Sequence, residues 1–297
     1  MCNMKTFLQK TITFLGIPFI FILLLIAFFS FNLSSKKYTI ASNISEIYVG
    51  DSHIRLSVND SLLTKSKNLG ENSEAFYFSY YKIKKILSAN PNIKKLYLGV
   101  SYHSLSDYYD NYIFGEYSSV ISQCYFFTLP VNGQLKYLYY NVKNLSYYKG
   151  IIESGVCKLY KKNVPFLGAY SNEFGQTSAS VKTMNDRLNE QFFYANGKLK
   201  YFSLNQLFYL KEIINLCKDY DIDLVFFNTP LHSYYRNKLP KEYIEKYNTL
   251  IKEENLNLID FSALPLNDDC YIPDGDHVSQ KGASIMTIEL KKIISTN

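Results

Sequence analysis

The sequence has no tryptophan, few cysteines and few histidines. Its 297 residues include five cysteines and four histidines, and no two cysteines form a Cys-x-x-Cys pair. This spacing does not fit a zinc site, so we expect no bound metal, and no motif indicates a cofactor. Cys124 and Cys157 could pair in an oxidising compartment, although spacing cannot show it, and free buried thiols are the preferred interpretation.

Clustered charge is also absent. The net charge is +6, but Lys and Glu are interleaved without a basic cluster, so we expect no nucleic-acid partner. The 28 tyrosines and 21 phenylalanines could serve as stacking platforms for sugars. The accompanying Lys, Asn and Ile are typical of an AT-rich coding sequence, which is the simpler explanation. At 47% hydrophobic residues, the chain can bury the core of one ordinary domain plus an appendage.

One long apolar run lies near the amino terminus. No residue from Thr11 to Ser35 is charged, and about 20 such residues span a bilayer as a helix. We predict a short cytoplasmic tail (1–11), a transmembrane anchor (12–33) and a tether (34–43). A cleaved signal peptide is the alternative, but bulky phenylalanines stand where small residues would precede cleavage. Two lysines flank the run on each side, so charge does not orient the helix.

Strands and helices alternate through the remaining residues, 44–297. Short apolar runs between turn residues predict buried strands, and longer amphipathic stretches predict helices. Strands are expected at 46–49, before Asn68, and at 94–101, 222–227 and 256–261, with helices at 73–87, 204–219 and 241–254 and from a cap at Ser279 to about 294. This order predicts an α/β fold with a parallel sheet and helices on both faces. Residues 105–201 break the pattern, and we expect an inserted, partly helical subdomain there.

The histidines all fall at predicted strand ends or in the loop after the last strand. In open parallel sheets this edge binds ligands. Ser52 follows the first strand in the sequence GDSH, and serine becomes a nucleophile when an oriented histidine takes its proton. Asp274 and His277 stand three residues apart before the last helix and can share one turn that reaches Ser52. An ordinary surface turn is the alternative for Gly-Asp-Ser alone.

These two blocks resemble the SGNH (GDSL-type) hydrolase superfamily. In that family a Gly-Asp-Ser block follows the first strand and an Asp-x-x-His block lies near the carboxyl terminus, here residues 50–52 and 274–277. The resemblance implies a flavodoxin-like sheet, with Ser52 as nucleophile, His277 as base and Asp274 as the group that orients it. Asp276 is the alternative to Asp274. The Ser52 backbone N–H would belong to an oxyanion hole.

The other two blocks of the family are altered in this chain. The family's oxyanion glycine would fall near Ser73, and the third block lacks the usual Gly-x-Asn-Asp. The candidate oxyanion or substrate-contacting residues are therefore Gly70, Ser73, Ser101, His103 and His53. Loop-shaping or surface roles are the alternative for each of them. Asp51, Asn68, His232 and Asp260 are expected to be mainly structural.

The anchor, the large insertion and the altered third block resemble a membrane-anchored branch of the superfamily. That branch includes DltD-like proteins and acyltransferases of polysaccharide O-acetylation. The resemblance implies an extracytoplasmic domain at a bacterial inner membrane and acyl-ester transfer or hydrolysis through a Ser52 acyl-enzyme. The implied substrate is an envelope glycan or an acylated small molecule, and a membrane-embedded acyl donor protein is the implied partner. The alternative hypothesis is a non-catalytic glycan-binding or assembly component that keeps the fold.

Overall fold

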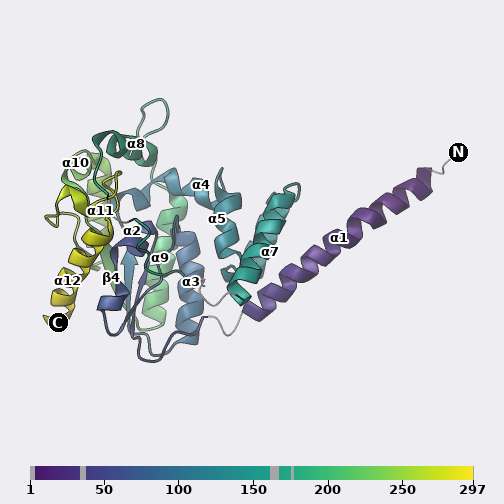
Figure 1. Ribbon diagram of the computed structural model, residues 1–297, viewed down its shortest axis with the longest axis horizontal. Helices are drawn as coiled ribbons and strands as arrows, with labels where there is room; N and C mark the ends of the chain where they lie inside the picture. Colours follow the sequence, from purple (N-terminus) through teal and green to yellow (C-terminus); the bar gives the residue numbers. More distant parts are fainter. Residues whose placement is uncertain (1–3, 34–37, 161–166, 175–176, 297) are drawn as a thin grey trace. The chain divides into compact units, whose positions relative to one another are not determined.

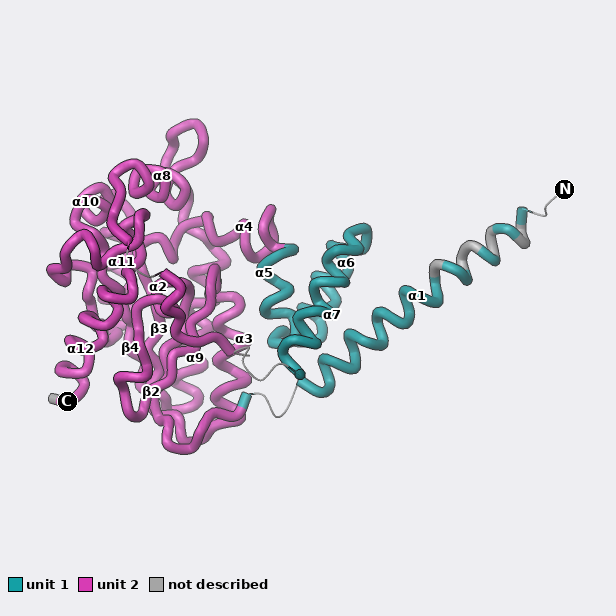
Figure 2. Tube along the Cα trace, viewed as in Figure 1, with its two compact units in different colours: residues 1–38, 119–166 teal, residues 39–118, 167–297 magenta. Residues whose placement is uncertain are grey.

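Two compact units make up the computed structural model (Figures 1 and 2). Unit 1 comprises residues 1–38 and 119–166, and unit 2 comprises residues 39–118 and 167–297. The structure describes residues 4–33, 38–160, 167–174 and 177–296. The predicted tether therefore lies partly outside the described residues, as does the start of the predicted tail.

Unit 2 contains a parallel sheet. Its strands are β1 (Glu46–Val49), β2 (Ser66–Asn68), β3 (Lys95–Gly99), β4 (Asp223–Asn228) and β5 (Asn257–Asp260). Their order is β2-β1-β3-β4-β5, and every neighbouring pair is parallel. The predicted α/β class and parallel sheet are confirmed. The strand order reverses between β1 and β3, and doubly wound sheets bind ligands in the crevice at such a point.

Helices cover both faces of this sheet (Figure 1). The helices of unit 2 are α2 (Ser52–Ser57), α3 (Phe76–Ala89), α4 (Asp110–Ile113), α8 (Val181–Phe192), α9 (Leu204–Asp219), α10 (Ser233–Arg236), α11 (Lys241–Glu253) and α12 (Gln280–Thr296). α2 packs with α12, and α3 packs with α9. The backbone carbonyl of Ser279 accepts the Ala283 N–H at 2.9 Å, so α12 begins where the sequence predicted.

Apolar strand residues fill the space between the helices and the sheet. Because helices cover both faces, β1, β3 and β4 are continuous apolar runs and do not alternate with polar residues. Tyr48 stacks on Tyr97 with ring centroids 4.3 Å apart, and Phe227 meets Tyr48 edge-on. Ile54 of α2 and Met286 of α12 join this cluster. The core thereby fixes α2, which begins with Ser52, against the sheet.

Two glycines let α2 approach the strand ends closely. A Cβ atom at Gly99 would lie 2.4 Å from Cγ1 of Ile54, and a Cβ atom at Gly70 would lie 2.5 Å from the backbone nitrogen of Arg55. Both distances are far shorter than a van der Waals contact. A side chain at either position would therefore displace α2.

Unit 1 is helical. It contains α1 (Met4–Leu33), most of α5 (Ser118–Tyr125), α6 (Val131–Tyr140) and α7 (Leu145–Tyr160). Within α1, Gly16–Leu33 has a mean hydropathy of 2.4 and is long and apolar enough to cross a membrane. α7 packs along α1 (Figure 2). Cys157, Cys217 and Cys270 are free thiols, so the structure shows no disulfide between Cys124 and Cys157.

The residues between β3 and β4 are divided between the two units. The sequence pattern predicted one subdomain at 105–201, but residues 119–166 cluster with α1, and the remainder belongs to unit 2. The pattern could not show this division because α7 covers its apolar face with α1, which lies far away in the chain. Within unit 2, Ser106 and Phe202 form an antiparallel bridge that joins the two ends of the excursion.

Candidate active site

Ser52 stands at the carboxyl edge of the sheet because α2 begins directly after β1. Asp51 caps α2, and its Oδ1 accepts the backbone N–H of His53 at 2.9 Å. The N–H groups of the first helical turn have no partner inside the helix, so the N–H of Ser52 is one of these donors. The Ser52 side chain is half-buried.

Ser52, His277 and Asp274 form a chain of hydrogen bonds. The Oγ of Ser52 lies 2.7 Å from Nε2 of His277, and Nδ1 of His277 lies 2.7 Å from Oδ2 of Asp274. The other oxygen of Asp274 accepts the backbone N–H groups of Asp276 at 3.0 Å and His277 at 3.1 Å. The structure thus brings together three residues that the sequence analysis singled out, although Ser52 and His277 are 225 positions apart.

The charge of Asp274 fixes the tautomer of His277. Burial opposes ionisation of this carboxyl, but the neighbouring His277 and its hydrogen bond lower the pKa of Asp274 below its usual range. An ionised carboxylate only accepts hydrogen bonds, so Nδ1 of His277 must carry the proton between them. Nε2 is then the acceptor for the Ser52 hydroxyl. This is the arrangement of a serine nucleophile with its general base.

A second, buried layer of histidines and aspartates lies behind these three residues. The His53 ring is centred 4.5 Å from His277 and 4.4 Å from His103. Nδ1 of His53 lies 2.9 Å from Oγ1 of Thr229, and Nε2 lies 3.3 Å from Oδ1 of Asp276. The latter contact is an ion pair without hydrogen-bond alignment, since neither atom has a hydrogen-bond partner in the described part of the chain.

Opposite pKa shifts distinguish the two inner histidines. Burial and the charge of His53 lower the pKa of His103. Burial also opposes a charge on His53, but Asp276 and Asp51 raise the pKa of His53. His103 Nε2 lies 3.2 Å from Oδ2 of Asp51, which also accepts the Tyr109 hydroxyl. His53 therefore binds a proton more readily than His103.

Asp276 belongs to this second layer, where it faces His53 and Arg187. Asp274, not Asp276, is the carboxylate bonded to His277. Asp276 is fully buried, and its Oδ2 accepts hydrogen bonds from Nε of Arg187 at 3.0 Å and Nε2 of Gln191 at 2.7 Å. Burial would raise the pKa of Asp276, but His53, His103 and Arg187 hold it well below its usual range. Both donors lie on α8, in the insertion. No local pattern in the sequence links α8 to residues 274–277, so neither donor was predicted.

Two candidate oxyanion donors already have partners inside the protein. The N–H of Gly70 donates to Oδ1 of Asn68 at 2.8 Å. The side-chain amide of Asn68 in turn donates to the backbone carbonyl of Ile54 at 2.8 Å, which ties the loop after β2 to α2. Ser101 donates its hydroxyl to Oδ1 of Asn228 at 2.7 Å.

The remaining candidates differ in their access to solvent. Ser73 is half-buried in the turn before α3 and has a φ of +56°. His53 and His103 are each 2% exposed, so both lie beneath the surface that a substrate would meet. His232 lies 3.0 Å from Asp268 through Nε2 and caps α10 with Nδ1, which is a structural role.

Two overlapping groups of side chains could hold a metal ion by their spacing. The atoms of Asp51, His53 and His103 lie within 4.8 Å of one another, and so do those of His53, Asp276 and His277. Hydrogen bonds to protein atoms already occupy both ring nitrogens of His277, Nδ1 of His53 and both oxygens of Asp51. These contacts favour a proton-holding network over an ion.

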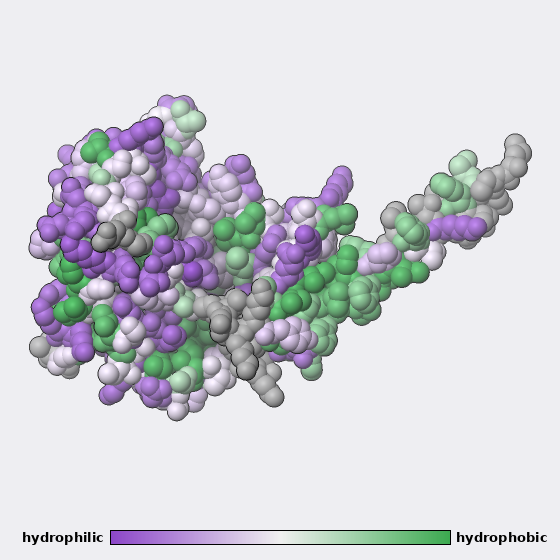
Figure 3. Space-filling view, in the orientation of Figure 1, coloured by the Kyte–Doolittle hydropathy of each residue, from purple (hydrophilic) through white to green (hydrophobic). Residues whose placement is uncertain are grey.

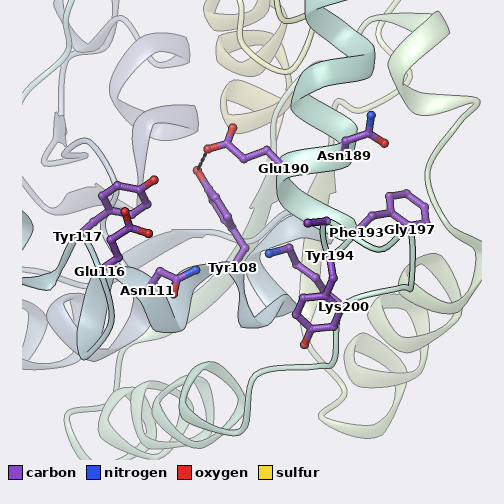
Figure 4. A pocket seen from close by; sticks show the side chains of 11 residues that line it. Tyr108, Asn111, Glu116, Tyr117, Asn189, Glu190, Phe193, Tyr194, Gly197 and Lys200 are labelled. Atoms are coloured by element: carbon purple, nitrogen blue, oxygen red, sulfur yellow. Dashed lines mark hydrogen bonds between the residues drawn. The ribbon is translucent and has the colours of Figure 1, made fainter.

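An open cleft of about 750 Å³ lies beside α8 (Figure 4). Its lining combines aromatic rings with amide, carboxylate and ammonium groups from Tyr108, Asn111, Glu116, Tyr117, Asn189, Glu190, Phe193, Tyr194 and Lys200. The Tyr108 hydroxyl donates to Glu190 at 3.3 Å and accepts from Nη1 of Arg187 at 3.1 Å. Because Arg187 also binds Asp276, the same side chain connects the cleft to the buried layer behind Ser52.

No family model matches this chain, and no curated protein matches it. A doubly wound sheet hosts many unrelated functions, so the fold by itself does not indicate an activity. The contacts of Ser52, His277 and Asp274 are therefore the main indication of function.

Proposed function

We propose that this chain is a membrane-anchored, SGNH-type acyl-ester enzyme, an O-acyltransferase or esterase. The observation that carries the proposal is the 2.7 Å contact between Ser52 Oγ and His277 Nε2, with Asp274 bonded to the other ring nitrogen at 2.7 Å. A serine that only caps a helix needs neither a base nor a carboxylate behind that base. The position of Ser52 directly after β1 also fits the superfamily.

The proposed reaction proceeds through an acyl-enzyme. Ser52 Oγ attacks the carbonyl carbon of an ester while its proton passes to Nε2 of His277. The bond to the leaving alcohol breaks, and His277 returns the proton to that oxygen. Water or an acceptor hydroxyl, deprotonated by His277, then attacks the acyl carbon. The bond between that carbon and Ser52 Oγ breaks, and His277 returns the proton to Oγ. Asp274 stabilises the imidazolium in both steps.

The oxyanion hole would have few donors. The N–H of Ser52 at the start of α2 is one, and the half-buried turn at Ser73 is the candidate source of another. Gly70 N–H and the Ser101 hydroxyl are bonded to Asn68 and Asn228. Loss of one oxyanion donor typically lowers kcat by about 10²–10³. We therefore expect the protein to turn over simple esters slowly.

The proposed substrate is an acylated or acyl-accepting glycan of the cell envelope. The apolar helix α1 supports a location at a membrane. The open cleft of Figure 4, which Ser52 does not line, would suit a polar ligand, because tyrosine rings there lie among amide and carboxylate groups. A membrane-embedded protein that delivers the acyl group is the proposed partner. The occupied donors Gly70 and Ser101 favour a second candidate function, a non-catalytic glycan-binding component.

Labelling of the full chain with a fluorophosphonate distinguishes these two functions. We expect one adduct per chain by intact mass, located on Ser52, and its loss in Ser52→Ala and His277→Ala. His232→Gln is the matched control, because it removes a histidine outside the site and should keep the adduct. Folded protein that acquires no adduct would overturn the enzymatic proposal in favour of the binding component.

A further inference from the structure

Helices α6 and α7 form a hairpin that lies along α1 within unit 1. The Tyr148 hydroxyl donates to the Leu138 carbonyl at 2.9 Å and joins the two helices. The Tyr148 ring is centred 5.9 Å from Phe19, and Ser30 donates its hydroxyl to Gln134 at 3.1 Å. Phe19 and Ser30 are separated by about 16 Å of helix. The hairpin therefore accompanies α1 over that length.

Close packing holds α7 against α1. A Cβ atom at Gly155 would lie 2.7 Å from Cγ of Phe29, so the glycine lets the two helices approach. Small residues play this part where helices associate in membranes. Phe29 also meets the Phe127 ring edge-on, at 6.2 Å between centroids. Contacts at Phe19, Phe29 and Ser30 thus hold the hairpin against one side of α1.

The uncharged run in α1 determines the depth of this hairpin in a bilayer. The run extends from Thr11 to Ser35, and a hydrocarbon core takes about 20 residues of helix. Every stretch of about 20 residues inside this run includes residues 16–30, and hence both Phe19 and Ser30. If α1 crosses the membrane, the hairpin that packs there lies at the level of the acyl chains.

The hairpin exposes an apolar stripe that no described residue covers. Val131 is 70% exposed, Leu135 is 60% exposed and Tyr139 is 77% exposed, each one turn apart on α6. Leu145 at the start of α7 is exposed as well. The apolar surface along α1, which Figure 3 shows, includes the exposed Phe21 and Phe31. Unit 1 thus presents apolar side chains from several helices to its surroundings.

The hairpin carries lysine and tyrosine side chains of the kind found where a membrane meets water. Nζ of Lys136 lies 5.9 Å from the Tyr140 ring centroid, and tyrosine and lysine are typical of the headgroup region. The long stem of a lysine lets its charge reach water from an apolar surface. On α7, Lys149 and Glu153 pair at 3.7 Å, which offsets their charges.

We infer that the α6–α7 hairpin is a lipid-contacting element that enters the bilayer beside α1, with Val131, Leu135 and Tyr139 against the acyl chains. The inference rests on the membrane anchorage included in the proposed function. Residues 119–166 join unit 2 at both of their ends, so the hairpin adds two covalent connections to the one that α1 provides. Unit 2 would then be held near the membrane by three segments.

The absence of tryptophan from the chain permits a direct test. Full-length Leu135→Trp would be reconstituted in phosphatidylcholine vesicles whose acyl chains carry bromine, which quenches indole fluorescence on contact. Phe21→Trp on α1 reports on the anchor. Leu204→Trp in unit 2 is the matched control, because Leu204 is also an exposed helical leucine. Tyr139→Trp provides a second probe of the stripe.

We expect quenching of Leu135→Trp and Tyr139→Trp within about a factor of two of Phe21→Trp, and no quenching of Leu204→Trp. Quenching of Phe21→Trp alone would overturn the inference and leave the anchor in place. A blue-shifted but unquenched signal from Leu135→Trp would also overturn it and would indicate that protein covers the stripe. No quenching at Phe21 would overturn both the inference and the anchor, while fluorophosphonate labelling reports separately on catalysis.

Discussion

The substitution Asp276→Asn tests the buried layer behind Ser52. It removes one charge without changing the size of the side chain, and it leaves Arg187 and His53 without the carboxylate that faces both of them. Removal of one partner from a buried ion pair typically costs 3–5 kcal/mol, whereas exposed pairs contribute about 0–1 kcal/mol. We therefore expect Asp276→Asn to lower the free energy of unfolding by about 3–5 kcal/mol. The folded-to-unfolded ratio would fall roughly 100- to 5,000-fold.

Glu190→Gln provides a matched control on the same guanidinium group. Glu190 lies 3.1 Å from Nη1 of Arg187, but its side chain is 51% exposed, whereas Asp276 is fully buried. We expect this control to cost less than about 1 kcal/mol. The assay is urea unfolding of the full chain in detergent micelles, followed by the fluorescence of the buried tyrosines. The variant Asp276→Asn/Arg187→Met completes a double-mutant cycle with the two single variants.

If Asp276→Asn and Glu190→Gln lowered the free energy of unfolding equally, this reasoning would be refuted. A cycle in which the effects of Asp276→Asn and Arg187→Met simply add would also refute it, because two side chains that bond each other must be energetically coupled. A large loss with strong coupling would establish that the insertion, through α8, stabilises the loop that carries Asp274 and His277.

Three further predictions concern buried residues that stabilise unit 2. Gly70→Ala should destabilise the fold by about 1–3 kcal/mol and slow the labelling of Ser52, because its Cβ would lie 2.5 Å from the α2 backbone; normal stability and labelling would contradict the close approach. The pKa of His53 is raised above 6.5, so its proton stabilises the fold fully below pH 6.5, and this contribution is lost as pH rises through the folded-state pKa. The stability difference between wild type and His53→Gln should shrink over that range, and a constant difference in urea titrations would contradict it. Lys82→Met should cost about 3–5 kcal/mol because the buried carboxylate of Glu74, 2.5 Å away, loses the ammonium group that balances its charge and keeps the hydroxyl of Ser79; adding Glu74→Gln should recover most of the loss, measured by urea midpoints.

Local patterns were sufficient to predict the sheet and the three residues of the candidate site. A buried parallel strand is a short apolar run, and residues at its carboxyl end lie at the ligand-binding edge. The predicted helix 204–219 coincides with α9, and the predicted strand 46–49 coincides with β1. Ser52 and His277 therefore come together because the topology of the fold requires both blocks to lie at one edge.

Features that depend on tertiary contacts could not be predicted in this way. Arg187 is one of two basic residues in the polar helix α8, and nothing in the neighbouring sequence indicates that it pairs with Asp276 at 3.0 Å. The apolar run of α1 predicts a lipid environment alone, whereas the structure buries Ile26, Phe29 and Leu33 against other protein side chains. The hydroxyl of Ser101 donates to Asn228 of β4, which follows the insertion in the sequence. Local sequence around Ser101 therefore gives no sign of this partner.

The separation of Ser52 from His277 also has a consequence for synthesis of the protein. The serine and its base are 225 residues apart, and chains grow at about 5–20 residues per second. A nascent chain therefore carries Ser52 for roughly 10–45 s before His277 exists. If Ser52 is the nucleophile that we propose, it stays an ordinary alcohol during translation and becomes reactive only after the last block has packed against the sheet. The proposed enzyme would then be unable to attack esters of the membrane while it is still being made.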